Sequence, residues 1–304
     1  MINGILNVYK EAGFTSHDVV AKLRGICRQK KIGHTGTLDP DAVGVLPVCL
    51  GNATRLCDML TDKSKEYEAV LRLGAVTDTQ DLSGTVLEEH PVTCSQEEAV
   101  AAILSFQGEY EQIPPMYSAL KVNGKKLYEL ARAGKEVERA ARSVQIHSLT
   151  ILKIQLPEVT FRVSCSKGTY IRTLCHDIGQ RLGCGGAMKS LKRTRVGAFD
   201  VEDALPLSRI QELADEGELE KYVIPVEEMF ASCPRVVVKP EFERLIENGN
   251  AFYPGQILSR VEGKGCEDGG NGWIRVCSGA GRFFGVYAFS EENGRYQPVK
   301  MFLS

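Results

Sequence analysis

A stiff loop that runs into an apolar segment near the start of the chain constrains its fold most. Residues 33–40 read Gly-His-Thr-Gly-Thr-Leu-Asp-Pro, and the apolar run Val-Leu-Pro-Val-Cys-Leu follows at 45–50. The proline disfavours helical backbone at Asp39, and the apolar run is predicted to be a buried strand. A carboxylate on a stiff loop beside a core strand suits a nucleophile or a general base. The alternative is an ordinary Asp-Pro turn in which the carboxylate bonds to its own backbone.

Helices and strands are mixed along the chain without a regular βαβ period. Residues 15–18 (Thr-Ser-His-Asp) fit a capping box before a helix over 16–29, and residues 95–98 cap a second helix that runs through Leu104. The mixture favours an α+β fold with a mixed, largely antiparallel central sheet and flanking helices. Periodicity predicts strands over 67–73, 144–154, 159–165, 235–239, 273–277 and 283–289, and helices over 171–182, 206–228 (an acidic helix with its lead-out) and 241–247.

The pattern changes near residue 230, which divides the chain into two expected domains. At 304 residues the chain is long enough to bury more than one core. Residues 1–230 hold the mixed helices and strands, and residues 231–304 hold short strands broken by glycine and proline. A polar Gly-rich loop is expected from Gly263 to Gly272. The second domain is predicted to be small and β-rich, and one role open to it is a structural cap on the first.

Composition excludes several classes of protein. Apolar residues make up 43% and charged residues 25% of the chain, as in ordinary globular proteins. We see no basic leader with a long apolar run and no stretch long enough to cross a membrane, so we expect a cytoplasmic protein. The ten cysteines include no C-x-x-C pair, which predicts mostly free thiols and no metal site. Neither a Gly-rich phosphate loop nor a dinucleotide fingerprint is present, so we expect no cofactor.

The charges are segregated although the net charge is only −2. Residues 22–31 carry five basic residues and no acid, residues 121–142 carry seven basic residues against three acids, and residues 189–195 carry four basic residues. By contrast, residues 200–228 hold ten acids and two basic residues. If the three basic runs share one face, they form an electropositive groove for phosphates. Each run taken alone is more typical of a solvated surface.

Several strings occur in the order found in one family of RNA-modifying enzymes. The segment from Gly33 to Arg55 resembles the signature of the TruB family of bacterial tRNA pseudouridine-55 synthases. The resemblance is weaker at Tyr-Lys-Glu (9–11), where the family usually has Asp-Lys-Pro, and weakest beyond residue 230. Further matching strings are Lys-Glu-Tyr (65–67), Thr-Asp-Thr-Gln-Asp (77–81), Pro-Pro-Met-Tyr-Ser-Ala-Leu-Lys (114–121), Gly-Lys-Lys-Leu-Tyr (124–128), Cys-Ser-Lys-Gly-Thr-Tyr-Ile-Arg (165–172) and Leu-Lys-Arg-Thr-Arg (191–195).

This resemblance implies a fold, an activity and a partner. The fold would be that of the pseudouridine synthases, followed by a PUA-like RNA-binding domain. The activity would be isomerisation of uridine 55 in the T-loop of tRNA to pseudouridine, with the base flipped into a pocket and no cofactor. The partner would be the T-arm stem-loop of tRNA, bound by a monomer that needs no other protein.

The resemblance also implies a set of site residues. Asp39 would be the catalytic carboxylate, although the atom it attacks first stays open. Arg172 would offset the burial of Asp39, and Tyr67 would stack on the base and is a candidate proton acceptor. The residues implied to contact RNA are His34, Lys10, Tyr170, Leu191, Lys121, Lys125, Lys126, Arg132, Lys192 and Arg193.

Two other functions remain open on the sequence alone. One is an RNA-binding or RNA-folding module without chemistry, which leaves unexplained why an Asp-Pro loop, a tyrosine and an arginine match catalytic positions together. The other is a related isomerase that acts on ribosomal or other RNA, with or without a guide RNA. The basic segment 121–142, whose Gly-Lys-Lys-Leu-Tyr string resembles tRNA-specific members, and the absence of long Lys-rich tails favour tRNA.

Overall fold

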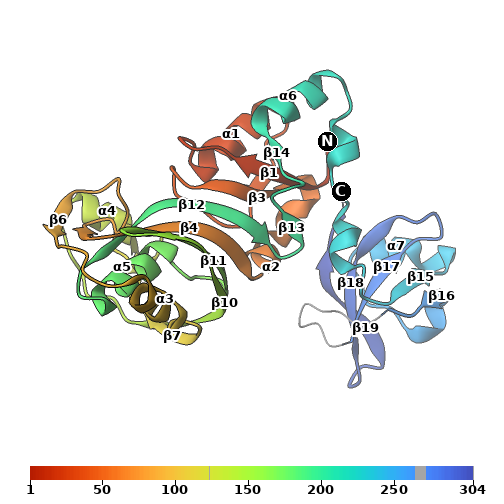
Figure 1. The fold of residues 1–304 in the computed structure, drawn as a ribbon. Coiled ribbons are helices and arrows are strands. Elements are labelled where there is room, and N and C mark those ends of the chain that lie inside the picture. Colours follow the sequence, from red (N-terminus) through yellow and green to blue (C-terminus); the bar gives the residue numbers. More distant parts are fainter. Residues whose placement is uncertain (123, 264–271, 304) are drawn as a thin grey trace.

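A ten-stranded mixed sheet forms the body of the molecule (Figure 1). The computed structural model describes residues 1–122, 124–263 and 272–303. The strands of this sheet are β1 (Gly4–Lys10), β2 (Ile32–His34), β3 (Val43–Leu50), β4 (Lys65–Leu73), β7 (Gly108–Gln112), β10 (Arg142–Gln155), β11 (Glu158–Cys165), β12 (Gly186–Val196), β13 (Phe199–Asp200) and β14 (Leu205–Pro206). Their order is β14-β1-β3-β12-β4-β11-β10-β7, with β2 paired to β3 and β13 to β12. Among the described pairs of this sheet only β1–β14 and β3–β12 are parallel, so the predicted antiparallel character is confirmed.

Two groups of helices bury the two halves of this sheet. Figure 1 shows α1 (Ser16–Ile26) and α6 (Leu207–Asp215) beside β1 and β3, where Leu23 and Ile210 share a core with Leu46. On the other half, α3 (Gln96–Leu104) and α5 (Ile171–Arg181) pack against β4, β10 and β11, where Leu174 contributes to the core around Phe161. Strand β12 runs between the halves and joins β3 to β4. Elements from both halves therefore meet along β12.

The local signals in the sequence located most of these elements. The capping boxes at Thr15 and Ser95 are both present. The first helix ends at Ile26 instead of continuing to residue 29, because Arg28 adopts a φ of +49°. The acidic segment 206–228 is helical only through α6, and two short 3-10 turns follow, η2 (Leu219–Tyr222) and η3 (Val226–Phe230). Strand β12 was not predicted, since its residues were interpreted as a charge cluster.

Smaller elements complete the body. Helix α2 (Cys57–Thr61) follows the 3-10 turn η1 (Gly51–Leu56), and a short hairpin joins β5 (Ala75–Thr77) to β6 (Val86–Glu89). A second hairpin pairs β8 (Lys121–Val122) with β9 (Lys125–Lys126) and leads directly into α4 (Leu127–Arg132). In the described part of the chain no helix is long and apolar enough to cross a membrane. Among the residues that the structure describes, eight cysteines are free thiols, in line with the prediction that most would be.

The C-terminal region forms a separate five-stranded sheet, as the predicted fold class requires. Its order is β16-β15-β17-β18-β19, and the sheet packs on the body through an aromatic group of Phe230, Phe283 and Phe302. The side chain of Arg55 donates to the Met301 carbonyl at 2.6 Å. The expected loop from Gly263 to Gly272 lies outside the described residues apart from its two ends. The elements are β15 (Arg235–Val238), η4 (Pro240–Phe242), α7 (Glu243–Glu247), η5 (Pro254–Gln256), β16 (Ile257–Val261), β17 (Trp273–Cys277), β18 (Phe283–Ser290) and β19 (Arg295–Met301).

Candidate active site

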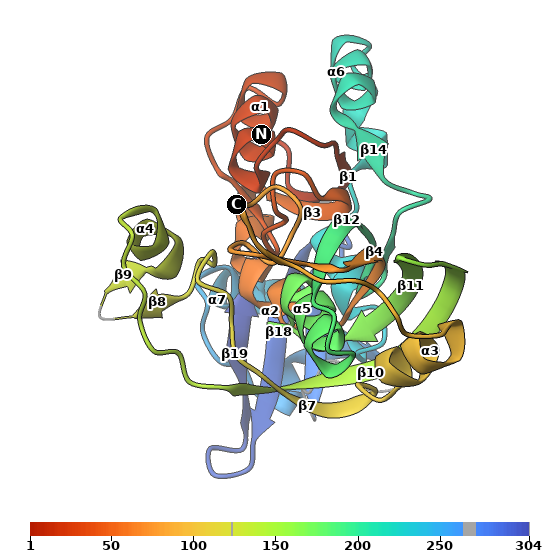
Figure 2. The ribbon, with the colours of Figure 1, turned by 60° about the vertical axis from the view of Figure 1, so that its left-hand side comes forward.

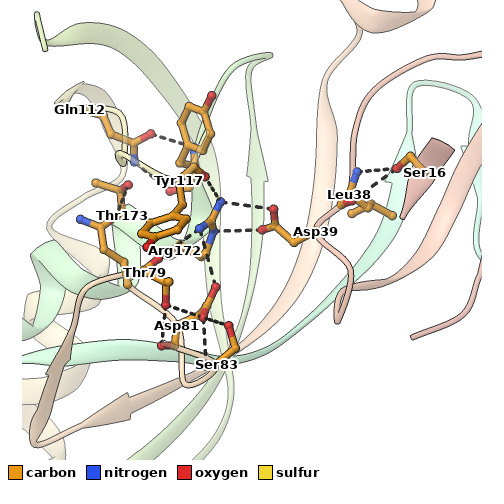
Figure 3. A network of polar contacts seen from close by, with 12 residues as sticks. Ser16, Leu38, Asp39, Thr79, Asp81, Ser83, Gln112, Tyr117, Arg172 and Thr173 are labelled. Atoms are coloured by element: carbon orange, nitrogen blue, oxygen red, sulfur yellow. Dashed lines mark hydrogen bonds and ion pairs between the residues drawn. The ribbon is translucent and has the colours of Figure 1, made fainter. Parts of the chain in front are cut away.

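Asp39 lies on the loop between β2 and β3, which neighbouring elements hold in place. The Leu38 N–H donates to the Ser16 hydroxyl at 2.9 Å and ties the loop to the start of α1 (Figure 3). The Lys10 ammonium donates to the Pro40 carbonyl at 2.9 Å. These contacts restrict the backbone on both sides of Asp39, whose side chain is still 38% exposed. The carboxylate is thus fixed in position and accessible from outside.

Arg172 faces Asp39 from the first turn of α5. Its Nε lies 3.0 Å from Asp39 Oδ2, and its Nη2 donates to Oδ1 at 3.3 Å, so the planar guanidinium holds the carboxylate at two points. The carbonyls of Thr79 and Tyr117 accept two further N–H groups of the guanidinium at 3.1 and 2.8 Å (Figure 3). The pairing predicted between two residues 133 positions apart is therefore present.

Asp81 is a second carboxylate beside Arg172, and the sequence analysis assigned it no role. Its Oδ2 lies 3.7 Å from Arg172 Nη1, while its Oδ1 accepts from the hydroxyls of Thr79 (2.7 Å) and Ser83 (2.6 Å). The Asp81 carboxylate is therefore fixed on one oxygen and faces the guanidinium with the other (Figure 3). Its signal in the sequence was its place in the matching string 77–81.

The neighbouring charges set the ionisation of Asp39. Burial raises the pKa of the Asp39 carboxyl above its ordinary value, because the charged form loses solvent. The Arg172 guanidinium is the largest influence that lowers this pKa, and Lys10 lowers it as well, whereas Asp81 raises it. Arg172 therefore keeps Asp39 ionised at a lower pH than burial alone would allow.

Tyr67 and Leu191 lie on adjacent central strands. In the register of β4 and β12, Tyr67 is opposite Arg193 and Leu191 is opposite Ala69. Both are buried in the same apolar core as Leu38, the residue that precedes Asp39. Burial raises the pKa of Tyr67 to about 12, against the opposing Arg193 charge. The phenol is consequently neutral at pH 7 and carries its proton.

Tyr170 sits at the N-cap of α5, where Gln112 holds its backbone. The Tyr170 N–H donates to Gln112 Oε1 at 2.7 Å, and Gln112 Nε2 donates to the Tyr170 carbonyl at 3.0 Å. One buried amide thus pairs with both backbone groups of the residue that caps the helix of Arg172. Gln112 was not predicted as a site residue, because its only signal in the sequence is its position just before the matching string 114–121.

His34 ends β2 and stands before the Asp39 loop. Its Nδ1 accepts the Gly36 N–H at 3.3 Å, and its ring meets His17 edge-on with 5.9 Å between the ring centroids. Burial lowers the pKa of His34, and the nearby His17 and Arg193 lower it further. The imidazole is therefore neutral at pH 7 and suits stacking better than a charge contact.

Two basic residues that the resemblance assigned to RNA contact, Lys10 and Arg193, are instead buried in the protein. Lys10 has no exposed surface, and its ammonium donates to the carbonyls of Glu11, Pro40 and Ala42. Arg193 is 1% exposed. Strand geometry explains the second error, because Arg193 and its neighbour Lys192 point to opposite faces of β12.

The rest of the basic run at 189–195 is largely neutralised by acids. Lys189 lies 2.7 Å from Glu158, and Arg195 lies 3.3 Å from Glu66. Lys192 is half-buried on the outer face of β12. The three predicted basic runs therefore do not contribute equally to one phosphate-binding face.

The basic segment around α4 has the opposite character. Figure 2 shows the β8–β9 hairpin and α4 projecting away from the large sheet. Lys121, Lys125 and Arg132 are exposed. Lys126 Nζ and Arg132 Cζ lie 5.3 and 5.5 Å from the centroid of the Tyr128 ring, which gathers two positive charges about one side chain. This surface is accessible to a polyanion.

Comparison with known proteins decides the family. The family model described as "TruB family pseudouridylate synthase (N terminal domain)" matches residues 24–171, and the one described as "tRNA pseudouridylate synthase B C-terminal domain" matches residues 172–231. A protein of Lachnoclostridium phytofermentans named tRNA pseudouridine synthase B is 54% identical over 99% of this chain and 100% of its own length. The chain belongs to the TruB family. It is thus a pseudouridine synthase, an isomerase.

Other TruB relatives and solved structures agree with this assignment. The tRNA pseudouridine synthase B of Clostridium acetobutylicum is 44% identical over 96% of this chain and 97% of its own length. A chain from the crystal structure of a Cbf5-Nop10-Gar1 complex aligns with a TM-score of 0.71 at 27% identity, covering 99% of this chain and 85% of that one. A chain from an H/ACA RNP bound to a substrate RNA aligns with a TM-score of 0.70 at 25% identity, covering 99% and 85%. The TruB fold therefore extends over nearly the whole chain, including the C-terminal sheet.

Proposed function

We propose that the protein isomerises uridine 55 in the T-loop of tRNA to pseudouridine, with Asp39 as the catalytic carboxylate. The observation that carries this proposal is the two-point pair between Asp39 and Arg172, which holds an ionised carboxylate on a rigid and accessible loop. Relatives of nearly full length at 44–54% identity are named tRNA pseudouridine synthase B, which supports tRNA as the substrate. The choice of uridine 55 as the target position follows from the resemblance of the sequence strings to the family.

The reaction needs few groups, and the site supplies them. The bond between uracil N1 and ribose C1′ breaks, the base turns, and C5 bonds to C1′ while its hydrogen leaves as a proton and N1 gains one. The target base is flipped out of the folded T-loop to reach Asp39. The Tyr67 ring offers a stacking face for the base, and His34 fills the gap that the base leaves in the loop. Tyr170 and Leu191 flank the base.

The surface around α4 grips the RNA. Lys121, Lys125, Lys126 and Arg132 contact phosphates of the T-arm stem, with a contribution from Lys192. This RNA-binding surface is connected to the active site through the chain just before it. The Leu127 N–H donates to the Leu120 carbonyl at 2.8 Å, and Tyr117, three residues before Leu120, supplies a carbonyl that Arg172 binds. The C-terminal sheet (within residues 231–304) adds an RNA-binding surface to the catalytic domain of residues 1–230, and the enzyme works in the cytoplasm as a monomer without a guide RNA.

One assay tests this function directly. Purified protein is incubated with an unmodified tRNA transcript, and pseudouridine is mapped by carbodiimide-dependent stops of reverse transcription. We expect a single new stop at position 55, without any added RNA or protein. Modification at another position, or none without a guide RNA, would overturn the proposal.

A further inference from the structure

Gln80 adopts a backbone conformation that is uncommon for a residue with a side chain. Its φ is +64°, and among the described residues only one other residue besides the glycines, Arg28, has a positive φ. A residue stays in the left-handed region only where its surroundings hold it there. The Gln80 N–H donates to the Thr77 carbonyl at 3.2 Å, and the Gln80 carbonyl accepts the Met188 N–H at 3.0 Å. Both backbone groups of this residue are thus bonded.

The side chain of Gln80 is held as well, by Thr173 in the first turn of α5. The Thr173 hydroxyl donates to Gln80 Oε1 at 2.7 Å, and Thr173 is only 1% exposed. The two residues are 93 positions apart in the sequence. This hydrogen bond therefore ties a strained turn to the helix residue that directly follows Arg172.

The two residues that flank Gln80 both face the Arg172 guanidinium. Nη1 of Arg172 donates to the Thr79 carbonyl at 3.1 Å and lies 3.7 Å from Asp81 Oδ2 (Figure 3). The φ angle of Gln80 is the rotation that relates the Thr79 peptide to the Gln80 side chain. When Thr173 holds that side chain, the left-handed φ fixes the direction in which the Thr79 carbonyl points.

These contacts bear on the geometry of the pair between Asp39 and Arg172. An arginine side chain has several rotatable bonds, so its guanidinium keeps one orientation only where several acceptors hold it. The turn formed by residues 79–81 holds Nη1, whereas Asp39 contacts Nε at 3.0 Å and Nη2 at 3.3 Å. A shift of the turn 79–81 would therefore turn the guanidinium and weaken its two-point contact with Asp39.

We propose that Gln80 and Thr173 are positioning residues of the isomerase: their side-chain hydrogen bond holds the left-handed turn that places the Arg172 guanidinium against Asp39. This inference rests on the proposed function. A bond that served structure alone would add only to the stability of the fold. A positioning bond also favours ionisation of Asp39, because a displaced guanidinium stabilises the carboxylate less.

The acidic limb of the rate profile reports the ionisation of Asp39. The charged and titratable groups that interact electrostatically with its carboxyl are Arg172, Lys10, Asp81, Tyr67 and Tyr170. Lys10 keeps its charge across this limb, because its pKa is about 8. Both phenols stay neutral, because burial raises the pKa of each. Displacement of Arg172, which lowers the pKa of Asp39 most, would raise that pKa and move the limb to higher pH.

The test removes the hydrogen bond with variants of similar shape. Thr173→Val keeps the branched side chain and removes the hydroxyl, and Gln80→Met keeps the length and removes the amide. Single-turnover rates are measured against pH on one tRNA transcript at saturating enzyme. We expect each variant to move the acidic limb upward by about half to one pH unit, which slows the reaction about three- to tenfold on that limb.

Further variants separate positioning from structure. Thr173→Ser retains the hydroxyl and should keep the acidic limb of the wild type. The double variant of Gln80→Met with Thr173→Val should shift the limb no further than either single change, because each already breaks the bond. Thr194→Val is the matched control, since it removes a buried threonine hydroxyl that donates to Glu66 on β4 at 2.9 Å and leaves Arg172 untouched. Its limb should not move.

Thermal unfolding of each variant is measured beside the rates. A lowered unfolding temperature with an unmoved acidic limb, or slowing that is equal at every pH, would overturn the proposal and assign the bond to structure alone. If Thr173→Val does not fold, Gln80→Met provides the same test at a half-buried position. Failure of the proposed function is distinguishable from these outcomes, because the wild-type protein would then leave uridine 55 unmodified.

Discussion

The Asp39 site and the α4 surface handle charge in opposite ways. At the site, the Asp39 carboxylate is held at two points by Arg172, a side chain only 7% exposed that also binds two backbone carbonyls. On the α4 surface, the charges of Lys125 and Arg132 stand in solvent, with an aromatic ring as the main contact for Arg132. Figure 2 shows α4 projecting away from the large sheet, to which the strands beside the site belong.

The difference reflects two kinds of work. Bond rearrangement depends on the position of a few atoms, so the contacts at the site hold the side chains of Asp39 and Arg172 in one conformation. Binding of a phosphate backbone depends mainly on the number of positive charges near it, and such contacts tolerate movement. Substitutions at the site should therefore affect rate more than affinity, and substitutions on the α4 surface should do the reverse.

The largest effect is expected from Asp39→Asn. The amide preserves the shape but removes the negative charge and the nucleophile, so the single-turnover rate should fall by at least about 10³-fold. The RNA dissociation constant should change by less than about threefold, because each factor of ten requires about 1.4 kcal/mol of lost binding. Asp41→Asn, at an exposed position in the same loop, is the matched control. Appreciable turnover by Asp39→Asn would remove Asp39 from the chemistry.

The next effect concerns Arg172 and the pH profile. Burial raises the pKa of Asp39 and Arg172 opposes that rise, so Arg172→Met should raise the carboxyl pKa further. Activity requires the ionised carboxylate, so the acidic limb of the single-turnover profile should move to higher pH and the loss should be greatest at low pH. Arg172→Lys keeps the charge without the planar fork and should fall between Arg172→Met and wild type. An unmoved acidic limb in Arg172→Met would contradict the electrostatic role of the pair.

A smaller effect on rate but a clear effect on affinity is expected from the α4 surface. Changing Lys125, Lys126 and Arg132 to Gln removes up to three phosphate contacts. The slope of log affinity against log salt should then become shallower by about two to three units. The single-turnover rate at saturating enzyme should stay near that of the wild type.

The matched control changes exposed basic residues elsewhere. Replacing Lys153 and Lys221 by Gln removes two positive charges, against three in the α4 variant, without touching the α4 surface. The salt dependence of this variant should resemble that of the wild type. If both variants lose the same slope, net charge and not the α4 surface governs binding.

The smallest effect is expected from Tyr128→Leu. The tyrosine ring lies near Lys126 Nζ and Arg132 Cζ, and an exposed cation–π contact contributes about 0.5–1 kcal/mol. Affinity for tRNA should fall only about two- to fivefold, with an unchanged maximal rate. A loss of affinity as large as that of the triple variant would mean that the basic side chains must be ordered to bind RNA. The α4 surface would then depend on precise positions, as the Asp39 site does.

Local patterns in the sequence predicted much of the fold and little of the site's geometry. Both capping boxes are predictable because their partners lie within one turn. The N-cap hydroxyl accepts the backbone N–H of the acidic residue three positions later, and that residue's carboxylate accepts the backbone N–H of the N-cap residue. Strand β12 was missed because its charged residues obscured the alternation, although alternation is what separates Lys192 from Arg193. Asp39 and Arg172 were recognised from family strings, whereas Gln112 and Asp81 had no pattern of their own to reveal their contacts.

The sequence by itself determined the local chemistry of this protein. It specified the stiff Asp-Pro loop, the apolar strand that follows, the helix starts and the family strings, because these depend on residues close together in the chain. Only the tertiary structure decided which charges are free to act. Lys10 and Arg193 are as basic in sequence as Lys125, but packing buries the first two beneath the Asp39 loop and leaves the third in solvent. Burial and pairing depend on contacts between distant segments, such as the 133 positions between Asp39 and Arg172, and no local pattern encodes those contacts.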